Sequence, residues 1–394
     1  MNGNLKILVT DGNYKHTLGI VRCLGIEGYT VYVASTTPKC LAGLSIYCKN
    51  TLITCNWNDN DNERQYIEQI KDYCNKYNID LVIPVGYKNC ILFSKYKDQI
   101  LKVSNVIIAD YQKMIFALNK AKILDFAKQL SVGIPDTIYP KSLSEVKAIA
   151  HTLNYPCVIK SRFEHGANVV AYPQNKKELE EEYSKIVNKY KFTNENLPMI
   201  QEYLTGDGYA FFALYINGEC KQIFMHHRLR EFPITGGASV KAEAFYDEKL
   251  LASGKKLLDA LEWHGVAMVE FKKDAQGNYK LMEINPKYWG STDLALAAGA
   301  LFPVITAQYI EGVDVKYSDH YDYTLKYHWP CDGDWVHAIY KPSHFFDVLK
   351  DCFNITVKSN WWWKEYRVNL YLIKRLIKDI AKAVSDKMGL RNVK

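Results

Sequence analysis

The chain has 394 residues, of which 48% are apolar and 24% charged, and a formal net charge of +7. These values are typical of a globular protein with two or three domains. Most of the net positive charge lies in residues 361–394, where nine lysines and arginines face three acidic residues. The rest of the chain is nearly neutral, which argues against a nucleic-acid-binding protein.

Ten cysteines are scattered along the chain without a C-x-x-C pair. This pattern argues against structural zinc and favours a reducing compartment. The start, MNGNLKILVT, leads directly into a strand pattern without a visible signal peptide. No apolar run approaches the ~20 residues that a spanning helix needs. We therefore expect a cytoplasmic protein.

The first 112 residues predict a doubly wound α/β domain. An apolar run at 5–10, a helical stretch at 17–27 and a strand at 30–34 form a βαβ unit. We expect further strands at 50–55, 81–84 and 106–109, and a helix at 63–77. The turn at 11–13 lies where nucleotide-binding folds hold phosphate, but it lacks G-x-G-x-x-G, so dinucleotide binding is not expected.

Residues 266–291, VAMVEFKKDAQGNYKLMEINPKYWGS, predict a β-hairpin around Gln276-Gly277. Folding about this midpoint places Glu270 opposite Glu283, with Asn285 on the face of Glu283. Like charges across a strand pair repel, so we expect a cation between them. Two carboxylates and an amide oxygen suit Mg²⁺. The alternative is an exposed hairpin with solvated glutamates, against which the apolar flanks argue.

The run Glu270…Glu283-Ile-Asn285-Pro resembles the metal-binding E…E-x-N signature of the ATP-grasp superfamily, and MEINPKYWGS is similar to its carbamoyl-phosphate-synthase-like and D-aspartate-ligase-like branches. The resemblance implies an N-terminal pre-ATP-grasp domain (1–112) and a two-lobed α+β ATP-grasp domain (113–318, lid lobe 135–203). Residues 319–394 would form a C-terminal extension. It also implies ATP with Mg²⁺, or Mn²⁺ in its place. Where the family has Arg after N-P, this chain has Lys287, to which we assign a catalytic role.

Two lysines match phosphate-binding positions of that superfamily. The order N-K…G-I-P gives Lys120 a nucleotide-phosphate contact, although a surface helix start is the alternative. Tyr155-Pro-Cys-Val-Ile-Lys160 resembles the strand whose lysine contacts the α- and β-phosphates. Residues 161–170 occupy the place of the family's glycine-rich lid, but their only glycine is Gly166. His165 in the same segment is a minor candidate for catalysis.

The run at 199–207, MIQEYLTGD, resembles the superfamily hinge that holds adenine in an apolar slot. It assigns nucleotide binding to Gln201, Glu202, Tyr203, Leu204 and Asp207. Asp207 would accept from ribose hydroxyls or act only as a turn residue.

Arg228 and Arg230 are predicted to share a strand face before a Gly-Gly loop, which would suit phosphate or carboxylate. The segment resembles R-x-R-E-x-P…G-G-[AS]-S of the same branch, which implies contacts to the γ-phosphate or the acyl acceptor. An exposed basic strand is the alternative. We expect strands at 209–216, 220–226, 321–329 and 336–340, and helices at 142–153, 245–261, 292–300, 302–310 and 366–388.

The activity that the resemblance implies is carboxylate–amine ligation through an acyl phosphate. The substrates would be small molecules, an amino acid, peptide or uronic-acid sugar, and a pathway such as polysaccharide biosynthesis would use them. A kinase acting on a small molecule and a nucleotide-binding module without turnover remain as alternatives. The sequence predicts no oligomeric state.

The C-terminal helix carries an apolar stripe with basic residues on its other faces. The stripe consists of Leu372, Ile373, Leu376, Ile377, Ile380, Val384 and Met388, and three tryptophans at 361–363 precede it. Two interpretations stay open. The helix packs on its own enzyme, or residues 361–388 make peripheral contact with the inner face of an anionic membrane.

Overall fold

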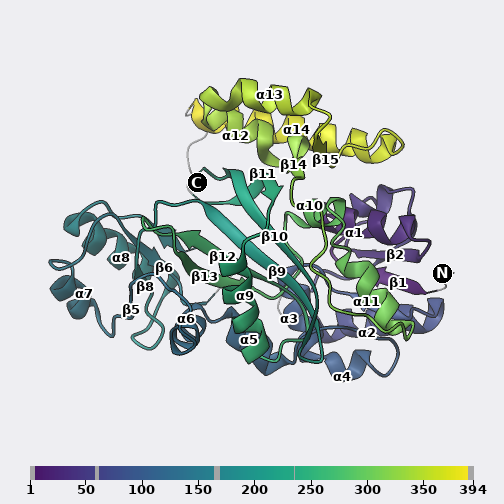
Figure 1. The fold of residues 1–394 in the computed structure, drawn as a ribbon, viewed down its shortest axis with the longest axis horizontal. Coiled ribbons are helices and arrows are strands. Elements are labelled where there is room, and N and C mark those ends of the chain that lie inside the picture. Colours follow the sequence, from purple (N-terminus) through teal and green to yellow (C-terminus); the bar gives the residue numbers. More distant parts are fainter. Residues whose placement is uncertain (1–4, 58–61, 164–168, 235, 389–394) are drawn as a thin grey trace.

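A computed structural model describes residues 5–57, 62–163, 169–234 and 236–388 (Figure 1). These residues form three sheets with helices around them, which confirms the predicted α/β class. In the first sheet the strands are all parallel, in the order β3-β2-β1-β4. Residues of its central strand, Ile7, Leu8 and Val9, are fully buried, as expected for a parallel sheet.

The elements of this N-terminal domain are β1 (Lys6–Val9), α1 (Lys15–Ile26), β2 (Thr30–Ser35), η1 (Ala42–Leu44), β3 (Cys48–Ile53), α2 (Glu63–Tyr77), β4 (Leu81–Ile83), α3 (Tyr87–Lys95), α4 (Lys97–Ile100) and α5 (Tyr111–Leu118). The predicted strand at 106–109 is wrong. Only Asn105 forms a single bridge, to Leu81, so this apolar run is buried without pairing along its length.

A second sheet of seven strands, in the order β13-β12-β9-β10-β11-β14-β15, forms the centre of the molecule. Its strands are β9 (Gly208–Ile216), β10 (Glu219–Phe232), β11 (Ala238–Ala244), β12 (Gly265–Lys273), β13 (Tyr279–Asn285), β14 (Lys326–His328) and β15 (Val357–Ser359). The neighbouring helices are α6 (Lys120–Gln129), α9 (Glu248–Ala260), α10 (Thr292–Ala297) and α11 (Phe302–Ile310).

A third, smaller sheet of four strands, β5-β8-β6-β7, lies to one side of the central sheet (Figure 1). It consists of β5 (Thr137–Ile138), β6 (Cys157–Lys160), β7 (Val170–Ala171) and β8 (Met199–Glu202), with α7 (Leu143–Ile149) and α8 (Lys176–Tyr190). Tyr183 and Leu179 of α8 belong to a small core of its own. The lobe is therefore packed as a separate unit beside the large core that the other two sheets share.

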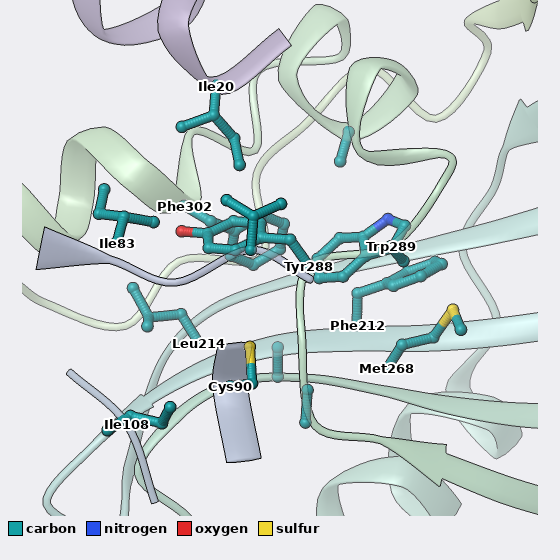
Figure 2. Packing of buried hydrophobic residues seen from close by; sticks show 14 of the residues in the cluster. Ile20, Ile83, Cys90, Ile108, Phe212, Leu214, Met268, Tyr288, Trp289 and Phe302 are labelled. Atoms are coloured by element: carbon teal, nitrogen blue, oxygen red, sulfur yellow. The ribbon is translucent and has the colours of Figure 1, made fainter. Parts of the chain in front are cut away.

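The loop after β13 is anchored in that large core (Figure 2). Trp289 stacks on Phe212 of β9 with ring centroids 4.3 Å apart, and Tyr288 is buried in the same cluster as Ile83 and Cys90 of the N-terminal domain. Aromatic side chains of this size hold a loop firmly because each buries a large apolar area. The position of Asn285, just before the loop, is fixed as a result.

The C-terminal extension forms a helical layer at one end of the molecule (Figure 1). Its helices are α12 (Trp335–Tyr340), α13 (Phe345–Phe353) and α14 (Tyr366–Lys387). The strand predicted at 336–340 is wrong because these residues form α12, which packs on α14, and the strand predicted at 321–329 is reduced to β14. Tertiary packing has overridden the local preference of β-branched and aromatic residues. No described helix is long and apolar enough to cross a membrane.

Candidate active site

The hairpin of β12 and β13 has the register predicted from its turn. Glu270 lies directly opposite Glu283, and Met268 lies opposite Asn285. The side-chain amide of Asn285 donates to Glu270 Oε1 and to Glu283 Oε1, at 2.9 Å in both cases. Two carboxylates and one amide therefore meet on one face of the sheet, as the sequence predicted, although the amide presents its nitrogen to the carboxylates and not the predicted oxygen.

Three cations from other segments surround this pair of carboxylates. Arg228 Nη2 of β10 lies 2.6 Å from Glu270 Oε2, and Lys120 Nζ, at the start of α6, lies 3.0 Å from Glu283 Oε2. Lys160 Nζ, at the end of β6, lies 3.9 Å from the same oxygen. A buried pair of like charges is costly unless it is compensated, and these three groups compensate it.

Burial alone would raise the pKa of Glu283. The ammonium groups of Lys120 and Lys160, with the amide of Asn285, outweigh burial and hold that pKa well below its usual range. Glu283 is therefore ionised at neutral pH and able to bind a cation. Hard oxygen donors of this kind fit Mg²⁺, which takes its other ligands from water and phosphate.

Small residues on β9 let Arg228 reach the carboxylates from two strands away. Ala210 is the β9 partner of Glu270, and Gly208 is the partner of Lys272. A Cβ on Gly208 would lie only 3.0 Å from Arg228 Cδ. The arginine therefore crosses β9 where β9 has no side chain. The sequence analysis did not identify this role of Gly208, although a glycine at the start of a buried strand was a signal for close approach.

Arg230 does not join this group, and the prediction that it shares a face with Arg228 is wrong. A bulge after Arg228 shifts the register, so that Arg228 lies opposite Ala242 but Arg230 opposite Lys241, on the other face. There Arg230 is buried and donates to Asp334 Oδ1 and Oδ2 at 2.8 and 2.7 Å and to Asp351 at 2.7 Å. Its place in the structure is an ion-pair network with the C-terminal extension.

This network includes a cluster that could suit a metal, formed by His328, Asp334 and Asp351. Lys241 Nζ lies 2.7 Å from Asp351, and Arg230 holds both carboxylates. Because two permanent cations already neutralise the two aspartates, the cluster has little attraction for a metal ion. Its role is to attach α12 and α13 to the central sheet.

The residues predicted to bind adenine lie at the end of β8 and in the segment that joins β8 to β9 of the central sheet. Gln201 is buried; its Nε2 donates to Thr137 at 3.0 Å, while Oε1 has no partner within the described residues. Glu202 Oε2 accepts from the Asp136 amide at 3.2 Å. Lys272, two residues after Glu270, donates to the carbonyl of Leu204 at 3.2 Å and lies over the ring of Tyr203. Segment 201–204 thus lies close to the carboxylate face.

Asp207 points elsewhere. Its Oδ2 lies 3.2 Å from Nε2 of His227, whose ring stacks on Tyr209. His227 alternates with Arg228 along β10, so this contact is on the face away from Glu270. The expected ribose contact does not fit this placement.

Lys287 follows Asn285 in a tight turn, where its amide donates to the Asn285 carbonyl at 2.9 Å. Its charge acts on the start of α1, where burial, with the charges of Lys287 and Lys15, lowers the pKa of His16 to about 3. The predicted lid residues His165 and Gly166 lie outside the described residues.

Comparison with known proteins finds similarity in sequence and in fold. Residues 195–330 match the family model "ATP-grasp in the biosynthetic pathway with Ter operon". A curated relative, pyruvate carboxylase of Aspergillus niger, is 24% identical over 178 residues, which are 41% of this chain and 15% of that protein. The chain thus spans only a small part of the length of this relative.

Many solved structures are similar in fold, and two of them are compared with this chain. N5-carboxyaminoimidazole synthetase from Staphylococcus aureus, complexed with ADP, has a TM-score of 0.62 and is 16% identical to this chain. The match covers 87% of this chain and 87% of that one. L-amino acid ligase from Bacillus licheniformis has a TM-score of 0.58 and 16% identity, over 79% of this chain and 75% of that one. The chain has the ATP-grasp fold, and the predicted resemblance to the superfamily is confirmed.

Proposed function

We propose that this chain is an ATP- and Mg²⁺-dependent carboxylate–amine ligase that forms an amide bond through an acyl phosphate. The observation that carries the proposal is the set of Glu270, Glu283 and Asn285 held in register and surrounded by Arg228, Lys120 and Lys160. Such a set can hold a metal together with the phosphates of a nucleotide. Two proteins of similar fold, a synthetase complexed with ADP and an L-amino acid ligase, support it.

In this proposal Glu270, Glu283 and Asn285 hold Mg²⁺, which when bound neutralises charge on the phosphate oxygens. Lys120 and Lys160 leave Glu283 and bind nucleotide phosphates, while segment 201–204 holds the adenine. A substrate carboxylate oxygen attacks the γ-phosphorus, the bond to the β–γ bridging oxygen breaks, and ADP leaves. The substrate amine then attacks the acyl carbon, loses a proton, and phosphate leaves.

Arg228 and Lys287 are the groups that this proposal places at the reacting end. Arg228 can release Glu270 and bind the transferred phosphate, because its planar guanidinium group donates two parallel hydrogen bonds to phosphate as well as to carboxylate. Lys287, two residues after Asn285, would stabilise the carboxylate substrate or its acyl phosphate. Catalysis would then consist mostly of positioning and charge neutralisation.

We infer that the substrates are a small carboxylate and a small amine, such as an amino acid, peptide or uronic-acid sugar, as in polysaccharide biosynthesis. All ten cysteines are unpaired, which supports a cytoplasmic location. Contact with the inner membrane face through residues 361–388 is part of this proposal.

The experiment measures ADP, inorganic phosphate and product mass with ATP, Mg²⁺ and pairs of candidate acids and amines. These candidates are first chosen by a thermal-shift screen with an ATP analogue. A ligase releases ADP and phosphate only when both substrates are present. ADP without phosphate would make the chain a kinase, and nucleotide binding without ADP formation would make it a binding module. Either result overturns the proposal.

A further inference from the structure

Helix α14 has two apolar faces, of which only one is covered. Val368, Leu372 and Ala383 are buried against the rest of the protein. The helix is also attached at its start, where Arg22 Nε of α1 donates to Glu365 at 2.6 Å. Part of the predicted apolar stripe therefore docks on its own enzyme.

The other apolar face is open to solvent. We call it the α14 stripe, and it consists of Tyr366, Leu370, Ile373 and Ile377, with exposed fractions of 63%, 53%, 36% and 62%. These residues follow one another at intervals of four, three and four, so they share one side of the helix. Such a continuous exposed apolar surface usually marks an interaction site.

Aromatic residues lie at the beginning of the stripe. Trp363, three residues before Tyr366, is 86% exposed, and its ring lies 5.8 Å from that of Trp361. Tryptophan and tyrosine are favoured at membrane–water interfaces because each joins an apolar ring to a polar group. This position suits a helix that lies in the membrane interface with its aromatic residues at the level of the lipid headgroups.

A basic face borders the stripe along its length. Arg367, Lys374 and Lys378 each directly follow a stripe residue and are exposed. Among the described residues, Lys374 and Lys378 form no ion pair. The acidic residues of this helix are Asp379 and Asp386, and Asp379 lies 3.9 Å from Arg375. The charge beside the stripe is therefore positive and suits an anionic surface.

We propose that the α14 stripe, with Trp363 and its basic border, docks on the surface of a bilayer that contains anionic phospholipids. The helix lies in the plane of the interface, with the stripe among the upper acyl chains and Arg367, Lys374 and Lys378 at the phosphates. This deepens the proposed function by naming the surface on which the ligase works. It does not depend on turnover.

The same charges argue against a second copy of the chain as the occupant. Two α14 helices that paired antiparallel through their stripes would bring one basic border next to the other. Like charges so placed cost affinity. An anionic lipid surface satisfies both the apolar stripe and its border.

The test is co-sedimentation of the full chain with vesicles of phosphatidylcholine alone or mixed equally with phosphatidylglycerol. We expect binding to the mixed vesicles, which weakens with salt. Lys374→Gln/Lys378→Gln should lower the partition coefficient about 30-fold. The matched control is Lys49→Gln/Lys102→Gln, two exposed lysines of the N-terminal domain, which should bind as the unaltered chain does.

A second pair of variants tests the stripe itself. Ile373→Asp/Ile377→Asp should abolish binding, whereas Ile26→Asp/Ile53→Asp, two exposed isoleucines of the N-terminal domain, should not. Circular dichroism checks that both pairs of variants keep their fold, and light scattering measures their oligomeric state. Equal binding to both kinds of vesicle, no binding at all, or a dimer that only the stripe variant dissociates would overturn the proposal. ADP formation measured without vesicles tests the ligase separately, since the stripe lies outside the proposed catalytic residues.

Discussion

Arg228 reaches across β9 at Gly208 to place its Nη2 2.6 Å from Glu270 Oε2. In this state the arginine donates a hydrogen bond to a carboxylate oxygen that a metal ion would need as a ligand. Lys120 likewise forms an ion pair with Glu283 Oε2, a second oxygen that the metal ion would need. Under the proposed function, loading of nucleotide and metal requires an exchange in which the carboxylates turn from the cationic side chains to the metal, and the cations turn to phosphate.

Glu283 is the first residue to test. Glu283→Gln removes one negative ligand, and we expect turnover to fall by about 1000-fold, since a bound metal contributes several kcal/mol to charge stabilisation. The measurement is ADP formation with an active substrate pair at saturating Mg²⁺. Glu219→Gln, an exposed change at the β10 start, is the control. Normal turnover of Glu283→Gln would refute the metal site.

Lys160 should act on nucleotide binding. Removal of a charged partner of phosphate typically costs ~2 kcal/mol, so Lys160→Ala should weaken ATP affinity about 30-fold. Lys160→Arg should restore it only in part, because a planar fork does not replace a compact point charge. Isothermal titration with an ATP analogue measures this, and Lys177→Ala on the exposed side of α8 serves as the control. Unchanged affinity in Lys160→Ala would contradict the placement.

Arg230 and Asp334 should matter for stability, not for nucleotide binding. Asp334→Asn leaves the buried Arg230 with only Asp351 as a full ionic partner, so the free energy of unfolding should fall by about 3 kcal/mol. ATP affinity, measured where the variant is folded, should not change. The control is Asp314→Asn at an exposed position, which should leave the free energy of unfolding measured in urea nearly unchanged. If Asp334→Asn lost ATP affinity and kept its stability, the network would belong to the active site.

His264 should make stability depend on pH. Its Nδ1 accepts from the Asn217 amide at 3.0 Å, which requires the neutral ring, and burial, with Lys97, lowers its pKa to about 4 while Asp110 opposes the shift. Because the unfolded chain takes up this proton at a higher pH than the folded one, stability is complete above ~6.5 and falls as pH drops toward the folded pKa.

Urea unfolding at about pH 7 and about pH 5 measures this effect. His264→Gln should reduce the loss of stability between the two by about 1 to 2 kcal/mol, since one pKa unit is ~1.4 kcal/mol. His320→Gln, an exposed histidine, is the control. An unchanged pH dependence in His264→Gln would show that the ring does not stay neutral in the folded protein.

The sequence alone determined those features that depend on short-range regularity. The turn around Gln276-Gly277 and the two-residue period of strands were enough to place Glu270 opposite Glu283 and Asn285 beside it. Lys160 was found at the end of a buried strand in the same way, whereas Lys120 was found through the resemblance of its segment to the superfamily pattern. The α/β class followed from the alternation of apolar strands with amphipathic helices.

Only the tertiary structure decided which side chains meet across segments. The bulge that turns Arg230 away from Arg228 has no signature in the strand pattern, because it depends on how β11 pairs with β10. Residues 336–340 form a helix because α14 and β10 pack on them, against their local preference. The apolar residues of α14 are alike in sequence. Leu372 is buried and Ile377 exposed because the position of the rest of the chain selects which side of a helix is covered.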